Sequence, residues 1–198
     1  MSVTPQYIET EVKVRCPAGA EEIRRRIERQ GYALLEPRTL ESDELFDRAE
    51  GELRRADKIL RLRRSYSKEA ALRATVTYKG PATRERYKSR EEIEFDVSDG
   101  DALVSILNRL GYAGSFRYQK YRTKFGTPGE PGTITLDETP IGAFLELEGT
   151  TEWIDRTAAC LGFSPTEYLT ASYAALYTEY RQANKAAPAN MTFDALNP

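Results

Sequence analysis

The stretch "YIETEVKV", residues 7–14, alternates apolar and charged side chains. Its apolar residues suit a β-strand, and Glu9, Glu11 and Lys13 share the opposite face, because successive side chains of a strand point to opposite sides. Neighbouring charges on that face lie about 7 Å apart. An ordinary sheet would leave such a face in solvent, whereas a charged interior site would enclose it. The rest of the sequence has to distinguish these two interpretations.

Length and composition limit the class of protein. The chain has 198 residues, of which 40% are hydrophobic and 30% charged, which predicts one domain or a small pair with a sizeable core. The net charge of −2 argues against a strongly basic nucleic-acid binder, so we expect no nucleic-acid partner. The N-terminus has no apolar signal region, and no apolar run approaches about 18 residues. We therefore expect a cytoplasmic protein that does not associate with membranes.

The side chains that bind soft metals are scarce. Cys16 and Cys160 match no zinc or disulfide spacing, and we expect both to be buried as small hydrophobic residues. The sequence has no histidine, which excludes Ser-His and Cys-His nucleophile pairs, histidine bases and the usual catalytic zinc sites. Any metal must be held mainly by oxygen ligands, which favours Mg²⁺, Mn²⁺ or Ca²⁺.

Strand and helix patterns alternate along the chain. Strands are predicted over residues 7–15, 41–47, 59–66, 71–80, 88–97, 115–125, 132–139 and 143–150. Helices are predicted over residues 19–31, 99–111, 150–162 and 164–182. The last helix should begin with Ser164 as N-cap and Pro165 at its first position. Apolar periodicity is lost beyond it, so we expect one domain over residues 1–182 and a mobile tail over 183–198.

Each strongly patterned strand has one charged and one apolar face, and its charges come in blocks of one sign. The acidic pairs are Glu9/Glu11, Glu92/Glu94 and Glu146/Glu148, and the basic pairs are Arg61/Arg63 and Lys120/Arg122. Two architectures fit this pattern: a sheet with one solvated face, or a closed barrel with a charged lumen. Like charges near 4 Å cost up to about 4 kcal/mol at an effective dielectric constant of 20. A charged lumen would therefore need a divalent cation for its acids and a polyanion for its bases.

The charged pairs also follow one another in a familiar order. Glu9-x-Glu11-x-Lys13 is followed by Arg61-x-Arg63 and by Lys79 in "TYKGP". The remaining members, in order, are Glu92-x-Glu94, Lys120-x-Arg122, Asp137, and Glu146-x-Glu148 within "IGAFLELEG". This ordered set, over residues 7 to about 181, resembles the CYTH superfamily, also called triphosphate tunnel metalloenzymes. A lone E-x-E-x-K motif would be a weak signal, whereas the complete series is specific.

The resemblance implies a fold and a group of activities. The implied fold is α+β, with an eight-stranded antiparallel closed β-barrel that forms a tunnel, a charged lumen and helices packed outside. The implied activity is divalent-metal-dependent hydrolysis of inorganic triphosphate, thiamine triphosphate or a nucleoside triphosphate. Other members are class IV adenylyl cyclases, which convert ATP to cyclic AMP and pyrophosphate. Those cyclases typically carry a His-Phe-x-x-Pro element, which this histidine-free chain lacks, so hydrolysis is the favoured interpretation. A non-catalytic polyphosphate or nucleotide binder is a further alternative, although it would gain little from so many carboxylates.

Roles for single residues follow from the same resemblance. It implies Mg²⁺ or Mn²⁺ ligands at Glu9, Glu11, Asp137, Glu146 and Glu148. It implies phosphate binding by Lys13, Arg61, Arg63, Lys79, Lys120 and Arg122. The catalytic set is then Glu9, Glu11, Lys13, Glu92 and Glu94, in which Glu92 and Glu94 bind a second metal, orient bases or position water. Arg90 and Lys124 share the predicted luminal faces.

Overall fold

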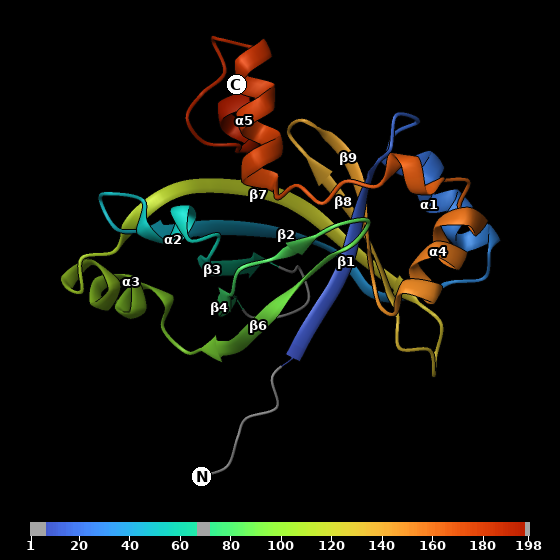
Figure 1. The fold of residues 1–198 in the computed structure, drawn as a ribbon, viewed down its shortest axis with the longest axis horizontal. Coiled ribbons are helices and arrows are strands. Elements are labelled where there is room, and N and C mark those ends of the chain that lie inside the picture. The colour runs from blue at the N-terminus through green and yellow to red at the C-terminus, as the bar shows by residue number, and fades with distance from the viewer. Residues whose placement is uncertain (1–6, 67–71, 197–198) are drawn as a thin grey trace.

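The architecture is a closed antiparallel β-barrel, seen in a computed structural model that describes residues 7–66 and 72–196 (Figure 1). Eight strands pair in the order β1-β9-β8-β7-β2-β3-β4-β6, and β6 pairs back onto β1 to close the barrel. A short ninth strand, β5, pairs with β6 alone. The strands are β1 (Tyr7–Arg15), β2 (Ala33–Asp47), β3 (Ile59–Tyr66), β4 (Arg73–Lys79), β5 (Thr83–Arg84), β6 (Lys88–Val97), β7 (Ala113–Gly126), β8 (Thr133–Thr139) and β9 (Gly142–Glu148).

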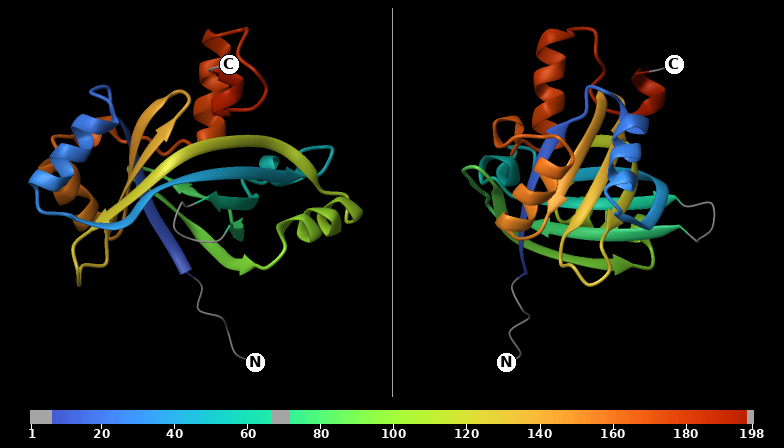
Figure 2. Two further views of the ribbon diagram at one scale, coloured as in Figure 1. Left: turned by 180° about the vertical axis from the view of Figure 1, so that it is seen from behind. Right: turned by 90° about the vertical axis from the view of Figure 1, so that its right-hand side faces the viewer.

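The helices lie outside the barrel wall. They are α1 (Ala20–Arg29), α2 (Glu52–Arg55), α3 (Gly100–Arg109), α4 (Thr151–Cys160), the 3-10 turn η1 (Pro165–Glu167), α5 (Tyr173–Ala183) and α6 (Phe193–Leu196). Helices α1 and α4 lie together at one side, α3 lies at the opposite side, and α5 projects away from the barrel (Figures 1 and 2). No helix in residues 7–66 and 72–196 is long and apolar enough to cross a membrane.

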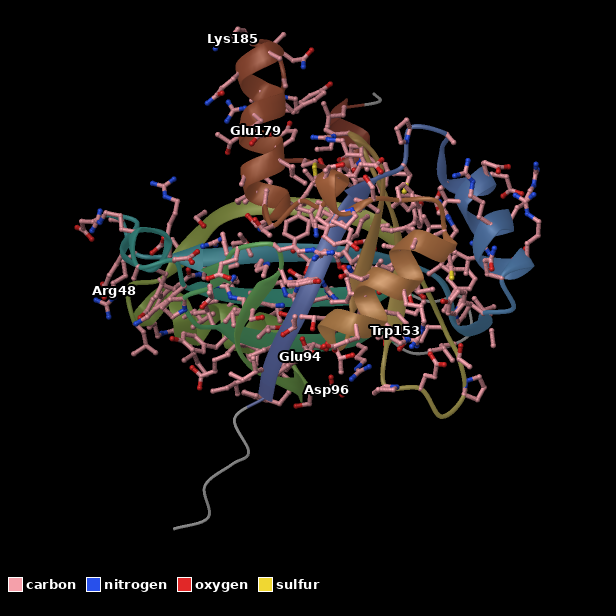
Figure 3. The ribbon with its side chains drawn as sticks, turned by 45° about the vertical axis from the view of Figure 1, so that its right-hand side comes forward. Arg48, Glu94, Asp96, Trp153, Glu179 and Lys185 are labelled. Atoms are coloured by element: carbon pink, nitrogen blue, oxygen red, sulfur yellow. The ribbon has the colours of Figure 1, made fainter. Side chains whose placement is uncertain are left out.

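The core lies on the outer face of the wall, between strands and helices. Val12 and Val14 of β1 are buried there against Ile23 of α1 and Trp153 of α4, which Figure 3 labels. A smaller cluster packs Leu62 of β3 beneath α3. Because each strand alternates with a period of two, burial of one face turns the charged face toward the barrel interior. The predicted closed barrel with a charged lumen is therefore confirmed, and the solvated sheet is excluded.

The predicted elements differ from the structure at a few places. Strand β2 begins at Ala33 rather than near residue 41, and α2 and β5 were not predicted. The polar turn expected around residues 67–70 lies outside the described residues. The predicted helix over 164–182 is wrong in its first half. Ser164 caps only the 3-10 turn η1, and α5 starts after Ser172, whose hydroxyl caps the helix by accepting a hydrogen bond from the Ala175 amide.

Two further predictions concern the cysteines and the C-terminal segment. Cys16 is buried as expected, but Cys160 is exposed, because it ends α4 on the solvent side. In the segment after residue 182, Met191 is fully buried and its backbone exchanges hydrogen bonds with β7. The expected domain limit at 182 and the mobility of this tail stay predictions.

Candidate active site

The barrel encloses a cavity of about 580 Å³ that is lined by the charged faces of its strands. Eight basic and seven acidic side chains line it, which gives a net formal charge of +1 among the described residues. The lining includes twelve of the thirteen residues predicted for metal binding, phosphate binding or catalysis. It also includes Lys124. Asp137 and Arg90 lie outside the lining.

Two arginines of β3 are held over buried acids of β2. The Arg63 guanidinium donates to Asp43 at 2.9 Å and to Glu41 at 3.2 Å, and Arg61 lies 3.4 Å from Asp43. Asp43 is completely buried and Glu41 nearly so. The neighbouring arginines hold the pKa of the Asp43 carboxyl below its ordinary value despite the opposing effect of burial. These acids therefore fix the arginine forks toward the cavity instead of leaving them free to move.

The same arrangement recurs on β7. Lys120 and Arg122 both donate to Asp137 of β8, at 2.9 Å and 2.7 Å. The hydroxyl of Tyr173, at the start of α5, donates to Asp137 at 2.7 Å, and its ring lies beneath the Lys120 ammonium, 4.9 Å from the ring centre. Burial, together with Asp137, raises the pKa of Tyr173 well above its ordinary value, so its proton stays in place. Asp137 thus lies behind the cavity wall, accepts hydrogen bonds from these three side chains and orients the two cations.

The acids of the remaining wall are paired with lysines. Lys79 donates to Glu9 at 2.6 Å and to Glu92 at 3.0 Å. Lys88 pairs with Glu11, and Lys13 pairs with Glu146. Each of these lysines is at least nine-tenths buried, so the ammonium groups cannot turn outward to solvent. The carboxylates are therefore neutralised inside the protein by the ammonium groups of these lysines.

Glu94 of β6 is a luminal acid that contacts an arginine instead of a lysine. It accepts from Arg61 at 3.2 Å and from the Thr77 hydroxyl at 2.7 Å. These contacts lower the pKa of the Glu94 carboxyl although burial acts to raise it. Glu94 therefore stays ionised beside the Arg61 guanidinium.

The two N-terminal acids differ in their pKa. Burial, followed by the neighbouring Glu11 carboxylate, raises the pKa of Glu9 to about 7, although Lys79 opposes this. Burial also acts to raise the pKa of Glu11, but Lys88 and Lys13 outweigh it and bring that pKa down to about 2. Of these two acids, Glu9 is therefore the one whose charge the protein compensates less, and a nearby divalent cation would compensate it.

The acidic donors fit a hard divalent cation. Glu11 of β1 and Glu148 of β9 are direct cross-strand partners, Glu9 lies two residues away on the same face, and Glu146 lies two residues before Glu148. All donors are carboxylate oxygens, which suit Mg²⁺ or Mn²⁺. In the described part of the chain, no three acids converge into a ready-made metal site, because lysines hold them. The donor chemistry and the undercompensated Glu9 nevertheless match the metal that the sequence implied.

Several residues of the cavity lining and of the contacts that support it were not predicted from the sequence. Lys88 begins β6 and was not assigned to the lumen, although its alternation with Arg90 placed it on that face. Glu41 and Asp43 belong to a strand with polar residues on both faces, so its inner face gave no clear signal. Tyr173 lies within the predicted last helix and was not assigned to the lumen. Arg90 instead bonds the backbone carbonyls of Gly80 and Asp57, behind the tunnel lining.

Comparison with known proteins agrees with this geometry. The sequence profile of the CYTH domain matches residues 7–159, and the chain belongs to the CYTH family. A Methanocaldococcus jannaschii protein named "Putative adenylate cyclase" is 28% identical over 141 residues, covering 71% of this chain and 76% of the relative. The PH1819 protein of Pyrococcus horikoshii has a similar structure, with a TM-score of 0.73 and 27% identity, covering 87% of this chain and 99% of that one.

A plant protein shares the fold at lower identity. It comes from Hippeastrum, and its structure is described as a "Putative adenylyl cyclase" that "reveals a dominant triphophatase activity". The TM-score is 0.54 with 15% identity, covering 89% of this chain and 95% of that one. At this identity the likeness establishes the barrel fold alone.

Proposed function

We propose that this protein is a divalent-metal-dependent triphosphatase that hydrolyses a triphosphate inside the barrel. One observation carries the proposal: the cavity is lined both by arginine and lysine groups that buried acids hold in place and by carboxylates that lysines and Arg122 neutralise. A triphosphate carries several negative charges, while the lining has a net charge of only +1. The anion therefore needs an accompanying cation, which the carboxylate wall would bind. CYTH tunnel enzymes generally use divalent metal ions, in agreement with this requirement.

The basic residues bind and align the phosphate chain. Arg63 and Arg122 offer planar forks that match two phosphate oxygens each, and Lys120 adds a point charge between them. Their buried acid partners fix their positions before substrate arrives, so little reorganisation accompanies binding. Lys13 and Lys79 would shift from their carboxylates to the phosphates when the metal occupies the acidic wall.

The acidic wall would hold the metal and handle the proton. Glu9, Glu11, Glu146 and Glu148 would bind Mg²⁺ or Mn²⁺, which draws charge from the phosphate oxygens. Water attacks the terminal phosphorus, the bond to the bridging oxygen breaks, and diphosphate leaves with the electron pair. A luminal carboxylate of β6, Glu92 or Glu94, would accept the proton of that water. Phosphoryl transfer depends mainly on alignment and charge stabilisation, so a site without histidine is sufficient.

The second candidate is an adenylyl cyclase, and the name of the M. jannaschii relative favours it. In that reaction the ribose 3′-oxygen attacks the α-phosphorus of ATP and pyrophosphate leaves. The dominant triphosphatase activity described for the Hippeastrum protein supports hydrolysis instead. A protein that binds polyphosphate or nucleotide without turnover is the third candidate.

A substrate panel distinguishes these candidates. The protein would be incubated with inorganic triphosphate, ATP and thiamine triphosphate in Mg²⁺ or Mn²⁺, and phosphate, pyrophosphate and cyclic AMP would be measured. Phosphate release supports the triphosphatase, and cyclic AMP with equimolar pyrophosphate supports the cyclase. Glu146→Gln should abolish turnover, whereas the control Glu138→Gln, on the outer side of β8 and paired with Arg38, should retain it. Tight binding without any product would overturn both enzyme assignments.

A further inference from the structure

A group of charged and aromatic side chains lies outside the barrel, where α4 meets two other segments of the chain. Its centre is Asp155 of α4, whose carboxylate accepts three hydrogen bonds. The hydroxyls of Tyr87 and Tyr168 donate to it at 2.8 Å and 2.9 Å, and the Arg86 guanidinium donates at 2.7 Å. We call these four residues the outer cluster. None of the four lines the tunnel cavity, so the proposed reaction does not use them directly.

The outer cluster rests on a firm support. Trp153, labelled in Figure 3, and Ile154 directly precede Asp155 and are buried in the core between α4 and the barrel wall. The rings of Tyr87 and Tyr168 pack against the same core, and their centres are 6.3 Å apart. Burial and the Asp155 carboxylate raise the pKa of both phenols, so each hydroxyl keeps the proton that it donates. The outer cluster therefore fixes both tyrosines relative to α4.

Tyr87 connects the outer cluster to a lysine of the lumen. It directly precedes Lys88, the first residue of β6. Lys88 is the cross-strand partner of Glu11, and its buried ammonium group pairs with the Glu11 carboxylate. Because the chain enters β6 immediately after Tyr87, the hydrogen bond from the Tyr87 hydroxyl to Asp155 limits how far the start of β6 can move. The position of Lys88 relative to Glu11 therefore depends on Asp155.

Tyr168 connects the same carboxylate to the next luminal residue of β1. It directly precedes Leu169, whose backbone exchanges hydrogen bonds of 3.0 Å and 2.7 Å with the backbone of Lys13. The pairing of β1 with β6 ends at Glu11, and β9 occupies the other edge of β1. Leu169 thus continues the edge that β6 leaves, two residues further along. Both connections to Asp155 meet where this edge of β1 passes from β6 to the segment before α5.

From these contacts we infer that Asp155 is a positioning residue of the tunnel, which acts through Tyr87 on Lys88 and through Tyr168 on Lys13. The inference rests on the proposed function and adds to it a residue that touches neither substrate nor metal. Lys88 lies against a carboxylate that is proposed to bind the metal, whereas Lys13 is proposed to bind phosphate. The two connections should therefore have different effects, one on metal binding and the other on triphosphate binding.

Removal of single hydroxyl groups tests the inference. Tyr87→Phe and Tyr168→Phe each delete one connection and keep the ring, and Asp155→Ala deletes both. Tyr32→Phe is the matched control, because the Tyr32 hydroxyl also bonds α4, at Thr157, and its ring packs against the same core. Phosphate release from inorganic tripolyphosphate or ATP, whichever the parent hydrolyses faster, would give kcat, KM and the Mg²⁺ concentration for the half-maximal rate. Calorimetry with Mn²⁺ alone would measure metal binding without turnover.

The inference predicts a separate change for each connection. Tyr168→Phe should raise KM by about threefold or more and change kcat less, because Lys13 is held less firmly. Tyr87→Phe should lower the half-maximal Mg²⁺ concentration and the Kd for Mn²⁺ by about threefold or more, because Lys88 then competes less for its carboxylate. Asp155→Ala should show both changes, and adding Tyr168→Phe to it should raise KM no further. Tyr32→Phe should show neither change.

Two results would overturn the inference alone. One is that the three variants keep KM and both metal constants within about twofold of Tyr32→Phe. The other is that they lose only kcat, which is what a general loss of folded protein would produce. In both cases phosphate release by the parent leaves the proposed function standing. A parent protein that releases phosphate from none of the triphosphates in the substrate panel would overturn the proposed function and this inference with it.

Discussion

Arg63 connects the stability of the barrel to its predicted capacity to bind triphosphate. Its side chain is 11% exposed and donates to Asp43 at 2.9 Å and to Glu41 at 3.2 Å. In Arg63→Ala, the fully buried Asp43 would keep Arg61, at 3.4 Å, and the more distant Lys120 as its cations. Removing one partner of a buried ion pair typically costs about 3–5 kcal/mol, because the other charge is left uncompensated. We expect a loss of unfolding free energy of this order.

The same substitution should weaken ligand binding by a separate mechanism. A hydrogen bond to a charged group contributes about 1.5–3 kcal/mol, so loss of the Arg63 fork should reduce triphosphate affinity roughly 10- to 150-fold. Denaturant unfolding would measure stability, and calorimetry with inorganic tripolyphosphate would measure affinity at a temperature where the variant is folded. Arg63→Lys helps to separate the two effects, because it keeps a charge near Asp43 but lacks the planar fork.

Two further variants test the roles assigned to Arg63. Arg73→Ala removes an exposed arginine of the neighbouring β4 that pairs with exposed Asp96, and it should leave both measurements nearly unchanged. Adding Asp43→Asn to Arg63→Ala should recover part of the lost stability, because the stranded charge is removed. If Arg63→Ala is as stable as Arg73→Ala, the buried ion pair is absent. If it binds tripolyphosphate as tightly as the parent, this face of β3 does not form the site.

Three further predictions test other parts of the molecule. Glu148→Gln should lose metal-supported activity and regain part of that activity at high Mn²⁺, whereas the control Glu138→Gln should keep full activity. An unchanged rate of Glu148→Gln at low Mg²⁺ would remove Glu148 from the metal site. The pKa of Glu9 is raised from 4.5 to about 7 in the folded protein without metal. Between these pH values the folded protein keeps a proton that the unfolded chain releases. The free energy of unfolding should therefore fall as the pH rises from 4.5 to 7, by up to about 3 kcal/mol from this group. Glu9→Gln should remove that pH dependence, and matching pH profiles for variant and parent would contradict it. Gly132→Ala would place a Cβ atom 2.1 Å from the Trp153 ring and should cost about 1–3 kcal/mol in denaturant unfolding; equal stability would mean that this ring does not pack there.

The period-two charge pattern made most of the lining predictable, and the family resemblance favoured the closed barrel over the solvated sheet. In a closed barrel every strand has one face inside, so alternation assigns residues such as Glu94 and Lys120 to the lumen without any knowledge of their neighbours. Alternation does not show whether a luminal side chain reaches the cavity surface or lies behind other side chains. Asp137 shares the luminal face, yet Lys120, Arg122 and Tyr173 lie over it and separate it from the cavity. The sequence therefore predicted its charge and face but could not distinguish a metal ligand from a residue that orients cations.

The parts that sequence reasoning missed depend on contacts between distant segments. The stretch before α5 looked helical because Ser164 and Pro165 form a good helix start. The backbone of Leu169 instead exchanges hydrogen bonds with Lys13 of β1, which holds this stretch extended across the barrel. That path also brings Tyr173 to Asp137. No local pattern encodes such a pairing, since its two strands are far apart in the sequence.

The charges that line the tunnel largely compensate one another, and this balance would determine how ligands enter. A triphosphate alone would draw Lys13 and Lys79 from their acids, which would leave Glu9 without its lysine and Glu146 with Arg122 alone in a buried site. A divalent cation alone would displace the same lysines and leave them without partners. When both enter, the cation occupies the acids and the lysines turn to the phosphates, so no buried charge is left uncompensated. Each ligand must therefore favour the binding of the other, and by thermodynamic linkage it does so by the same factor in both directions. The mixed signs of "YIETEVKV" are what this coupling requires, since a lining of one sign could not remain buried without its ligand.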